Sequence, residues 1–256
     1  MFADERYKVI QGMLNEKGSV TVSELQDKFQ ISTETVRRDL ITLERQGILK
    51  RVHGGAVKSV KMKEFHKMDL RKKEFSDEKY AIAEAAMELI KDGDIISIDS
   101  GSTAVIFAKV LKGRFNQLII ITHSLEVFQE LEGEPGYKLI LIGGEYLEEE
   151  SAFCGEIATS CINGLQVEKA FLFPSAISLM GGAMDFVTEL VPVQKKYINK
   201  ANHVYVLADH SKIETTALLK LCELQACDGI ITDANLDPNI YERYAQFDIN
   251  IIKAKK

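Results

Sequence analysis

The sequence predicts an α/β protein in two parts: a small N-terminal domain of helices and a hairpin, and a larger α/β domain with a mostly parallel sheet. Two patterns predict this division. Apolar residues recur at helical spacing as far as Arg45, whereas beyond Asp77 short apolar runs alternate with helical segments. The length of 256 residues and the hydrophobic content of 46% are sufficient for two buried cores.

Charge is divided unevenly along the chain. Residues 1–80 carry 17 Lys and Arg against 13 Asp and Glu, a net charge of +4. Residues 81–256 have a net charge of −10, and the two parts sum to the overall charge of −6. A basic N-terminal part ahead of an acidic domain keeps nucleic-acid binding open as a function, although the whole chain is acidic.

The cysteines predict neither a metal site nor disulfides. Cys154, Cys161, Cys222 and Cys227 have no C-x-x-C spacing and no histidines at zinc-finger spacing. We expect reduced thiols, no metal and no cofactor. Because the N-terminus lacks a secretion signal and no apolar run approaches the ~18 residues of a membrane span, we expect a cytoplasmic protein with no membrane partner.

Three helices and a hairpin are expected in the first part. Residues 4–16 form an amphipathic helix that Gly18 ends, residues 19–22 are β-prone, and a capping box beginning at Ser23 starts a second helix. Ser32 caps a third helix. Residues 48–52, the Gly54-Gly55 turn and Ala56-Val57 then form the hairpin. This order describes a winged helix-turn-helix, whose last helix enters the major groove of double-stranded DNA.

The third helix and the hairpin carry the candidate DNA contacts. A guanidinium can pair bidentately with guanine or hold a phosphate, and hydroxyls at a helix N-terminus also favour phosphate. An exposed pair of arginines can equally be plain solvated surface, and His53 can be a phosphate donor or a turn residue. Asp39 is expected to form an ion pair one turn away on its own helix. The predicted DNA-binding residues are Thr33, Thr35, Arg37, Arg38, Arg51, His53 and Gly54.

A basic segment separates the two domains. Residues 58–76 carry seven Lys and Arg against three Asp and Glu and keep no lasting apolar stripe, which predicts a partly helical linker. Its basic run, residues 71–73, is either solvated or in contact with the DNA backbone. The predicted boundaries are therefore 1–57 for the DNA-binding domain, 58–76 for the linker and 77–256 for the α/β domain.

The larger domain shows repeated βα units. A helix is expected over 77–91, a strand over 95–98 and a helix over 104–111, with further strands at 118–122, 139–142, 170–174, 203–208 and 229–232. In such sheets ligands bind at the carboxyl ends of the strands. The loop from Asp99 to Thr103 joins a strand end to a helix N-terminus, which is suitable for an anion or is a simple turn.

The N-terminal motif resembles a known family. The pattern S-x-x-T-V-R-R-D-L-x-x-L-x-x-x-G-x-x-x-R-x-H-G-G-A, from Ser32 to Ala56, is similar to the signature of DeoR-family bacterial transcription regulators. The resemblance implies a repressor of sugar or nucleoside metabolism genes, with Arg37 and Arg38 at the DNA and the wing, residues 51–55, beside it.

The larger domain resembles the sensor domain of the same family, which is similar in fold to ribose-5-phosphate isomerase. The resemblance rests on residues 99–103, Gly143-Gly144, Gly181-Gly182 and residues 209–212, among other short matches. It implies a phosphorylated sugar as effector, with residues 100–103 around the phosphate and a lysine as positive partner. The predicted effector-binding residues are Asp99, Ser100, Gly101, Ser102, Thr103, Thr122, His123, Gly143, Gly144, Asp209 and Lys212.

The sensor departs from the family pattern at three places. His123 stands where the family usually has Asn, Phe173-Pro174-Ser175 stands where Gly-Ala-Asp or similar is usual, and Gln194 replaces a usual Lys. These positions would help to shape the sugar pocket.

Three functions are compatible with the sequence. The first is a DNA-binding regulator controlled by a sugar phosphate, assembled as a homo-oligomer, dimer or tetramer, because one winged helix binds a short site weakly. The second is an isomerase-like enzyme fused to a DNA-binding module. Isomerisation needs a carboxylate at the sugar carbons, and residues 171–177 contain none, so we expect no catalytic residues. The third is a regulator whose sensor only oligomerises.

Overall fold

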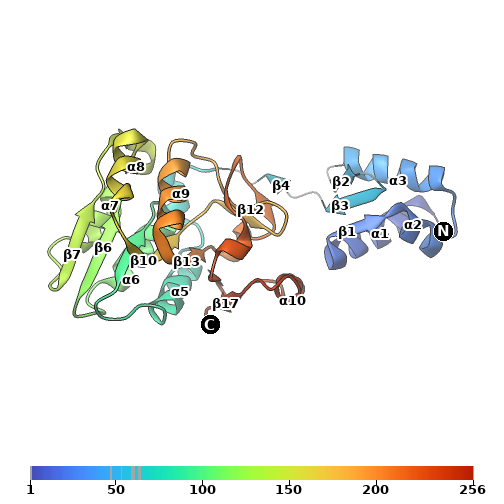
Figure 1. The fold of residues 1–256 in the computed structure, drawn as a ribbon. Coiled ribbons are helices and arrows are strands. Elements are labelled where there is room, and N and C mark those ends of the chain that lie inside the picture. Colours follow the sequence, from blue (N-terminus) through green and yellow to red (C-terminus); the bar gives the residue numbers. More distant parts are fainter. Residues whose placement is uncertain (1, 47, 53, 59–60, 63–64, 256) are drawn as a thin grey trace. The chain divides into compact units, whose positions relative to one another are not determined.

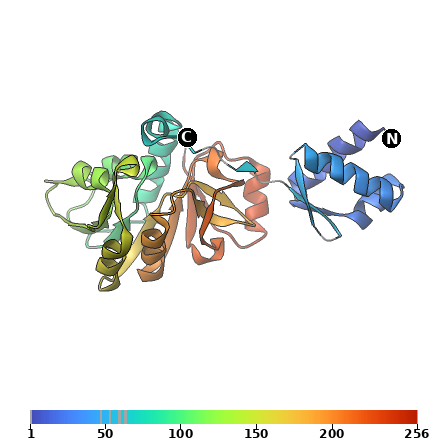
Figure 2. The same cartoon turned by 90° about the horizontal axis from the view of Figure 1, so that it is seen from above.

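The chain folds into two compact units, Met1–Lys61 and Met62–Lys256. The computed structural model describes residues 2–46, 48–52, 54–58, 61–62 and 65–255. His53, a predicted DNA contact, lies outside the described residues. Each unit is described by itself below, with the elements labelled in Figure 1 and seen from above in Figure 2.

The N-terminal unit is a winged helix-turn-helix, as predicted. Its elements are α1 (Ala3–Lys17), β1 (Ser19–Thr21), α2 (Val22–Phe29), α3 (Thr33–Arg45), β2 (Leu49–Val52) and β3 (Gly55–Lys58). One expectation is wrong: the capping box of α2 begins at Thr21, not at Ser23. The Thr21 hydroxyl accepts from the Glu24 N–H at 3.1 Å, and the Glu24 carboxylate accepts from the Thr21 N–H at 2.8 Å.

The wing is tied to the helices by a three-stranded antiparallel sheet of order β1-β3-β2. Gly55 is the first residue of β3 and pairs with Thr21, so it belongs to the strand and not to the turn. A Cβ at Gly55 would lie 2.1 Å from the Val20 carbonyl oxygen, so only glycine lets β1 approach this closely. Beneath the sheet, a core that includes Leu14, Leu25 and Leu40 fixes the three helices.

The C-terminal unit is built on a seven-stranded sheet of order β17-β16-β13-β10-β5-β6-β7, in which every described pairing is parallel. This confirms the predicted parallel sheet. Its strands are β5 (Ile95–Ile98), β6 (Leu118–Thr122), β7 (Tyr137–Leu141), β10 (Val167–Leu172), β13 (Ala201–Leu207), β16 (Gly229–Thr232) and β17 (Ile251–Lys253).

Helices cover both faces of this sheet (Figure 1). Neighbouring strand residues alternate between two apolar cores: Phe171 contributes to the core with α5 to α7, whereas Ala170 and Leu172 contribute to the core with α8 to α10. The helices are α5 (Ser76–Met87), α6 (Ser102–Leu111), α7 (Leu125–Leu131), α8 (Gly155–Asn163), α9 (Val191–Lys200) and α10 (Pro238–Ala245).

Several short elements frame one end of the sheet. Apart from one helix in the segment predicted to be a partly helical linker, they were not anticipated. They are α4 (Met68–Lys73), β4 (Lys61–Met62), the antiparallel pair β8 (Glu145–Leu147) and β9 (Ala152–Cys154), β14 (Thr215–Thr216), and the small antiparallel sheet of β11 (Ala176–Ser178), β12 (Gly182–Asp185) and β15 (Leu219–Cys222). None of the helices in the described part of the chain is long and apolar enough to cross a membrane.

Candidate functional site

Helix α3 presents a polar, basic face to solvent. Its apolar residues Val36, Leu40 and Leu43 are buried, and Arg37 and Arg38 are exposed on the other side. Arg38 is 77% exposed and its Nε lies 3.4 Å from Glu34, one turn earlier. Such an exposed pair contributes well under ~1 kcal/mol, so the guanidinium can readily be transferred to a nucleic-acid partner.

The N-terminus of α3 is held by side-chain hydrogen bonds. The Ser32 hydroxyl accepts from the Thr35 N–H at 3.3 Å, and its oxygen lies 3.0 Å from the Thr35 hydroxyl. Gln26 of α2 donates to the Thr33 hydroxyl at 2.8 Å, which links the two helices of the helix-turn-helix. Both predicted threonines therefore lie at the helix start, where backbone N–H groups attract phosphate.

The wing is fixed to α3 by Arg51. Its Nε lies 2.7 Å from Glu44, and the same carboxylate accepts from the Arg51 N–H at 2.8 Å. The backbone oxygen of Gly54, at the exposed tip, accepts from the Val22 N–H at 2.8 Å. Arg51 is thus a residue that orients the wing, and Lys50, which is exposed beside it, is the freer charge.

Asp39 does not pair on its own helix, which corrects the expectation above. It is buried and accepts two hydrogen bonds from Arg6 of α1, at 2.6 Å from Nε and 3.0 Å from Nη2. The i,i+4 rule failed because Asp39 lies on the inward side of α3, where its neighbours come from another helix. This bidentate pair fixes α1 against α3 and raises the pKa of Arg6 through the hydrogen bond to Asp39.

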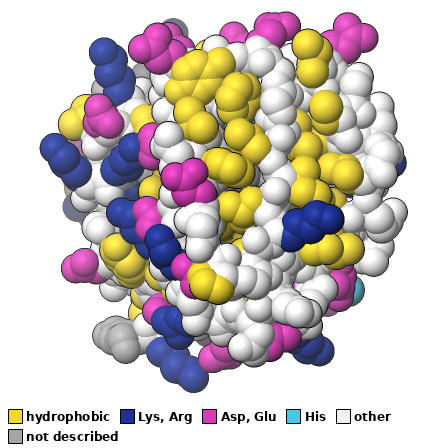
Figure 3. Space-filling model, turned by 90° about the vertical axis from the view of Figure 1, so that its left-hand side faces the viewer, with side chains coloured by type: hydrophobic (Ala, Val, Ile, Leu, Met, Phe, Trp, Pro, Cys, Tyr) yellow, Lys and Arg dark blue, Asp and Glu magenta, His cyan; other side chains and the backbone are white. Residues whose placement is uncertain are grey.

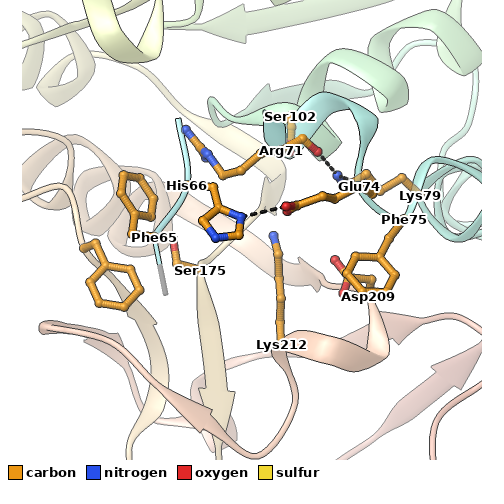
Figure 4. Close-up of a pocket in the computed structure, with 11 residues that line it drawn as sticks. Phe65, His66, Arg71, Glu74, Phe75, Lys79, Ser102, Ser175, Asp209 and Lys212 are labelled. Atoms are coloured by element: carbon orange, nitrogen blue, oxygen red, sulfur yellow. Dashed lines mark hydrogen bonds and ion pairs between the residues drawn. The ribbon is translucent and has the colours of Figure 1, made fainter. Parts of the chain in front are cut away.

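The C-terminal unit contains a small pocket at the carboxyl ends of its strands, with a cavity volume of about 30 Å³. Figure 4 shows that its wall comes from both sides: the segment before α5, and the ends of the sheet strands. Of the predicted effector residues, Ser102, Asp209 and Lys212 line it. The other lining residues are Phe65, His66, Arg71, Glu74, Phe75, Lys79, Ser175 and Phe186.

The segment predicted to be a linker forms much of this wall. Arg71 of α4 pairs with the buried Glu150 at 2.5 and 2.6 Å, and its guanidinium lies 4.6 Å from the centre of the Phe65 ring. Lys72 pairs with Glu126 at 2.7 Å. The basic run 71–73 is therefore not simply solvated, because two of its three cations are paired with carboxylates of the sheet-bearing unit.

Two lysines supply positive charge to the pocket. Lys79 donates to the backbone oxygens of Arg71 and Glu74, and Lys212 donates to the Pro174 oxygen at 3.1 Å. Burial lowers the pKa of Lys79 to about 8, with the charge of Lys212 adding to the effect, and burial also lowers the pKa of Lys212. A bound anion would stabilise both ammonium groups.

Beneath the pocket lies a network of buried polar side chains. The Gln194 amide donates to Asp99 at 3.1 Å and to Asp185 at 2.9 Å, and the Ser175 hydroxyl donates to Asp185 at 2.7 Å. Burial, with the Asp185 charge, raises the pKa of Asp99 to about 7. One amide thus bridges two carboxylates, which favours keeping one of them protonated.

His123 belongs to the same network. Its Nε2 lies 3.2 Å from the Ser100 hydroxyl and its Nδ1 lies 3.4 Å from the Tyr197 hydroxyl. Burial lowers the pKa of His123 to about 3, so the ring is neutral. His123 Nε2 also lies 3.5 Å from Asp99 Oδ1. His123 and Gln194, with Ser175 joined through Asp185, therefore lie in one layer of buried polar side chains around Asp99.

Several other predicted effector residues hold turns, helix starts and neighbouring strands in place and do not line the pocket. Gly101 has φ of 117° and caps α6, Thr122 accepts from the Ser124 N–H at 3.1 Å, and Thr103 is buried with no hydrogen-bond partner for its hydroxyl among the described residues. Gly143 and Gly144 do not line the pocket; a Cβ at Gly144 would meet the Cys154 oxygen of β9 at 2.3 Å. Glycine there permits the approach of β9.

Sequence reasoning missed Arg71, Lys79 and His66 as pocket residues. For His66 and Arg71 the only signal was their position in the basic segment 58–76, and a charge run alone does not show which residues will be buried. Lys79 lies in the helix predicted over 77–91 and carried no signal of its own. Within the described residues, no three His, Cys, Asp or Glu side chains group as a metal site requires.

These two units define a class of protein: a DNA-binding transcription regulator, with a winged helix-turn-helix and an α/β unit that has a small polar pocket at the carboxyl ends of its strands. A family model described as the DeoR-like helix-turn-helix domain matches residues 6–61, and one described as the DeoR C terminal sensor domain matches residues 74–234. The chain belongs to the DeoR family.

Curated relatives match nearly the whole chain. The lactose phosphotransferase system repressor of Lactococcus lactis subsp. lactis is 37% identical over 251 residues, covering 97% of this chain and 98% of the relative. The uncharacterized HTH-type transcriptional regulator YulB of Bacillus subtilis is 34% identical, covering 93% and 92%. The regulator GolR of Listeria innocua is 30% identical, covering 95% and 96%.

Among solved structures, the ribose 5-phosphate isomerase A of Methanocaldococcus jannaschii aligns with a TM-score of 0.41 at 21% identity, covering 54% of this chain and 55% of that one. No functional conclusion follows from a likeness this loose.

Proposed function

We propose that this regulator represses genes of sugar metabolism and that a phosphorylated sugar, bound beside Lys79 and Lys212, controls its affinity for the operator. The names of its relatives, the lactose phosphotransferase system repressors, support the class of gene. The observation that carries the proposal is the pair of ammonium groups at the pocket, that of the buried Lys79 and that of the partly buried Lys212, which donate hydrogen bonds to backbone oxygens.

The phosphate is proposed to bind between these lysines and the start of α6. Ser102, the first residue of that helix, lines the pocket, so the helix N-terminus with its free N–H groups opens onto the same space. A phosphate there neutralises charge that burial has made unfavourable. The sugar hydroxyls then have Glu74 and Asp209 as acceptors, beside the Phe65 and Phe186 rings, which lie 5.3 Å apart.

Effector binding is proposed to act on the segment that follows the DNA-binding unit. Residues 65–79 supply Phe65, Arg71 and Lys79 to the pocket, and Arg71 is held by Glu150. A phosphate that attracts Arg71 competes with this carboxylate. A ligand needs only a different affinity for two arrangements of α4 to shift their populations, and hence the DNA-competent fraction.

Ligand binding can be tested by thermal unfolding of the full chain with a panel of sugar phosphates, their parent sugars and inorganic phosphate. A true effector raises Tm by mass action, and its parent sugar does not. Lys212→Met should weaken binding at least tenfold, whereas Lys109→Met, at an exposed position of α6, should not. If no phosphate raises Tm at millimolar concentration, the alternative of a sensor that only oligomerises is preferred.

The pH dependence of binding follows from Lys79. Its pKa of about 8 means that its positive charge is lost as the pH rises through that value, so affinity for the sugar phosphate should fall above pH 8. Calorimetric titrations of wild type and Lys79→Met at pH 7 and pH 9 measure this. Wild type should weaken about tenfold and the variant should change less; equal changes would remove Lys79 from the site.

Operator reading is proposed for Arg37 and Arg38, with Thr33, Thr35, Arg51, His53 and Gly54 around them. The full chain should select a sequence from a random duplex library, and Arg38→Ala should weaken binding to it by ~1–3 kcal/mol if Arg38 pairs with a base. Unchanged affinity would remove Arg38 from base reading. Glu34→Ala, which frees Arg38 from its ion pair, serves as the matched control and should bind at least as well as wild type.

The regulator is proposed to act as a homo-oligomer and not as an enzyme. Figure 3 shows hydrophobic side chains gathered over the face where β7, α7 and α8 lie. β7 is an edge strand of the sheet, and Ile157 of α8 is 64% exposed. Sedimentation of wild type and Ile157→Glu tests self-association.

An assay of pentose and hexose phosphates tests catalysis, and sustained turnover would overturn the proposal of a regulator without catalysis.

A further inference from the structure

Two cysteines lie side by side at the edge of the C-terminal unit. Cys222 ends β15 and Cys227 follows the short 3-10 turn Leu224–Ala226, and their sulfur atoms are 3.7 Å apart. Both residues are partly exposed, so a small oxidant can reach them. A disulfide has an S–S length of about 2.05 Å, so small rotations of the two side chains bring the sulfurs into bonding distance.

We propose that Cys222 and Cys227 form a peroxide-reactive dithiol that closes to an intramolecular disulfide in the folded protein. This goes beyond DNA and effector binding, since neither the pocket nor α3 contains a cysteine. In a reducing compartment such a bond is transient, which is the behaviour of a redox-sensing pair rather than a structural one.

The surroundings assign different roles to the two thiols. The hydrogen bond from the Cys227 thiol lowers the pKa of Cys222, with the charges of Lys220 and Lys195 acting in the same direction. The same hydrogen bond, together with burial, raises the pKa of Cys227. Cys222 is therefore the thiolate that reacts first, and Cys227 is the thiol that resolves the product.

The chemistry balances with hydrogen peroxide as oxidant. The Cys222 thiolate attacks one peroxide oxygen, an S–O bond forms, the O–O bond breaks, and the departing hydroxide takes up a proton as water. The Cys227 sulfur then attacks the sulfenic sulfur; the S–S bond forms, the S–O bond breaks, and the hydroxyl leaves as water with the Cys227 proton. Two thiols lose two electrons and two protons, and one peroxide becomes two waters.

The strand that carries Cys222 is connected, through its neighbour β12, to residues that support the pocket. β15 pairs with β12, with Cys222 opposite Ala183 and Leu219 opposite Asp185. The Asp185 carboxylate holds Ser175, which lines the pocket, and Gln194. A disulfide that fixes the end of β15 therefore acts on the strand that supports the pocket floor.

Tryptic mapping of the full chain tests the proposal with an internal control. Cleavage after Lys220 and Arg243 places Cys222 and Cys227 in one peptide, and cleavage after Lys138 and Lys169 places Cys154 and Cys161 in another. After brief peroxide treatment and alkylation, the first peptide should lose two hydrogens and escape alkylation, and a reductant should restore both thiols. The second peptide should remain alkylated at both cysteines.

Variants separate the attacking thiol from the resolving one. Cys227→Ser should accumulate a sulfenic acid at Cys222 that a dimedone probe captures, and Cys222→Ser should leave Cys227 reduced under the same treatment. Cys161→Ser, at an exposed single thiol, should form the disulfide as wild type does. The proposal is overturned if Cys222 and Cys227 of the wild-type chain stay alkylatable at a peroxide concentration that oxidises Cys161.

Discussion

The two units place their charges in opposite ways. In the N-terminal unit the basic side chains of Arg37, Arg38 and Lys50 are exposed, whereas the C-terminal unit buries Asp99 and partly buries the pocket lysine Lys212. Exposed cations lose little on meeting a polyanion and gain through counterion release. Buried groups alter stability whenever their charge changes. The N-terminal unit is thus suited to bind DNA, and the C-terminal unit to convert a small ligand or a proton into a change of conformation.

The largest effect is expected at the Arg6–Asp39 ion pair, which is buried although the other charges compared in the N-terminal unit are exposed. Asp39→Ala leaves the Arg6 guanidinium without two short hydrogen bonds and should lower the free energy of unfolding by about 2–3 kcal/mol. Urea denaturation followed by circular dichroism measures this loss. Glu34→Ala removes an exposed ion pair from the same helix and should change stability by less than ~0.5 kcal/mol. Equal losses in the two variants would contradict the contrast between buried and exposed charge.

The second prediction concerns pH and the Asp99 carboxyl group. Its pKa is about 7 in the folded chain against an ordinary value of 3.8, so the folded chain binds more protons than the unfolded chain between those values. Stability therefore falls as the pH rises from about 4 to about 7. Between pH 5 and 7 this contributes about 2 kcal/mol, which Asp99→Asn should abolish.

Urea midpoints at pH 5, 6 and 7 give the slope. Asp92→Asn is the matched control: hydrogen bonds from Asn116 lower the pKa of Asp92 from its ordinary value, so the variant should leave the slope unchanged. If Asp99→Asn retains the wild-type slope, another group in the C-terminal unit binds the proton.

The smallest effect is expected for the exposed Lys50 of the wing, in the salt dependence of DNA binding. Lys50→Ala should reduce the slope of log affinity against log salt by about 1, with little change in sequence preference, because a lysine beside the backbone neutralises one phosphate. Fluorescence anisotropy over a salt series measures this slope. Lys109→Ala, on α6 of the other unit, should leave it unchanged. A Lys50→Ala slope equal to that of wild type would place the wing away from DNA.

The parts of the fold that sequence predicted are those with a repeating local pattern. The helical stripe of α3 is visible because its burial follows a period of 3.6 residues. The strands β5 and β6 are visible because they are continuous apolar runs, buried on both faces of a parallel sheet. The strands β11, β12 and β15 of the small sheet mix apolar residues with glycine or polar residues, so no apolar run marks them in the sequence.

The site was predicted only where it follows a strand. Ser102, Asp209 and Lys212 lie just beyond β5 and β13, at the sheet edge where ligands gather in such folds. Lys79 and Arg71 could not be assigned, because their burial depends on contacts such as that with Glu150, far along the chain. The Asp39 partner was wrong for the same reason: Arg6 lies 33 residues away.

The strand order of the parallel sheet has a consequence for synthesis. The strand β5 pairs with the central strand β10, and the chain between Ile98 and Val167 is about 70 residues long. At ~5–20 residues per second, a ribosome needs about 4–14 s to supply the second strand after the first. The N-terminal unit is complete at Lys61 and forms its contacts within that length. On the nascent chain, the DNA-reading unit can therefore be folded while the sheet that supports the pocket still lacks its central strand, β10.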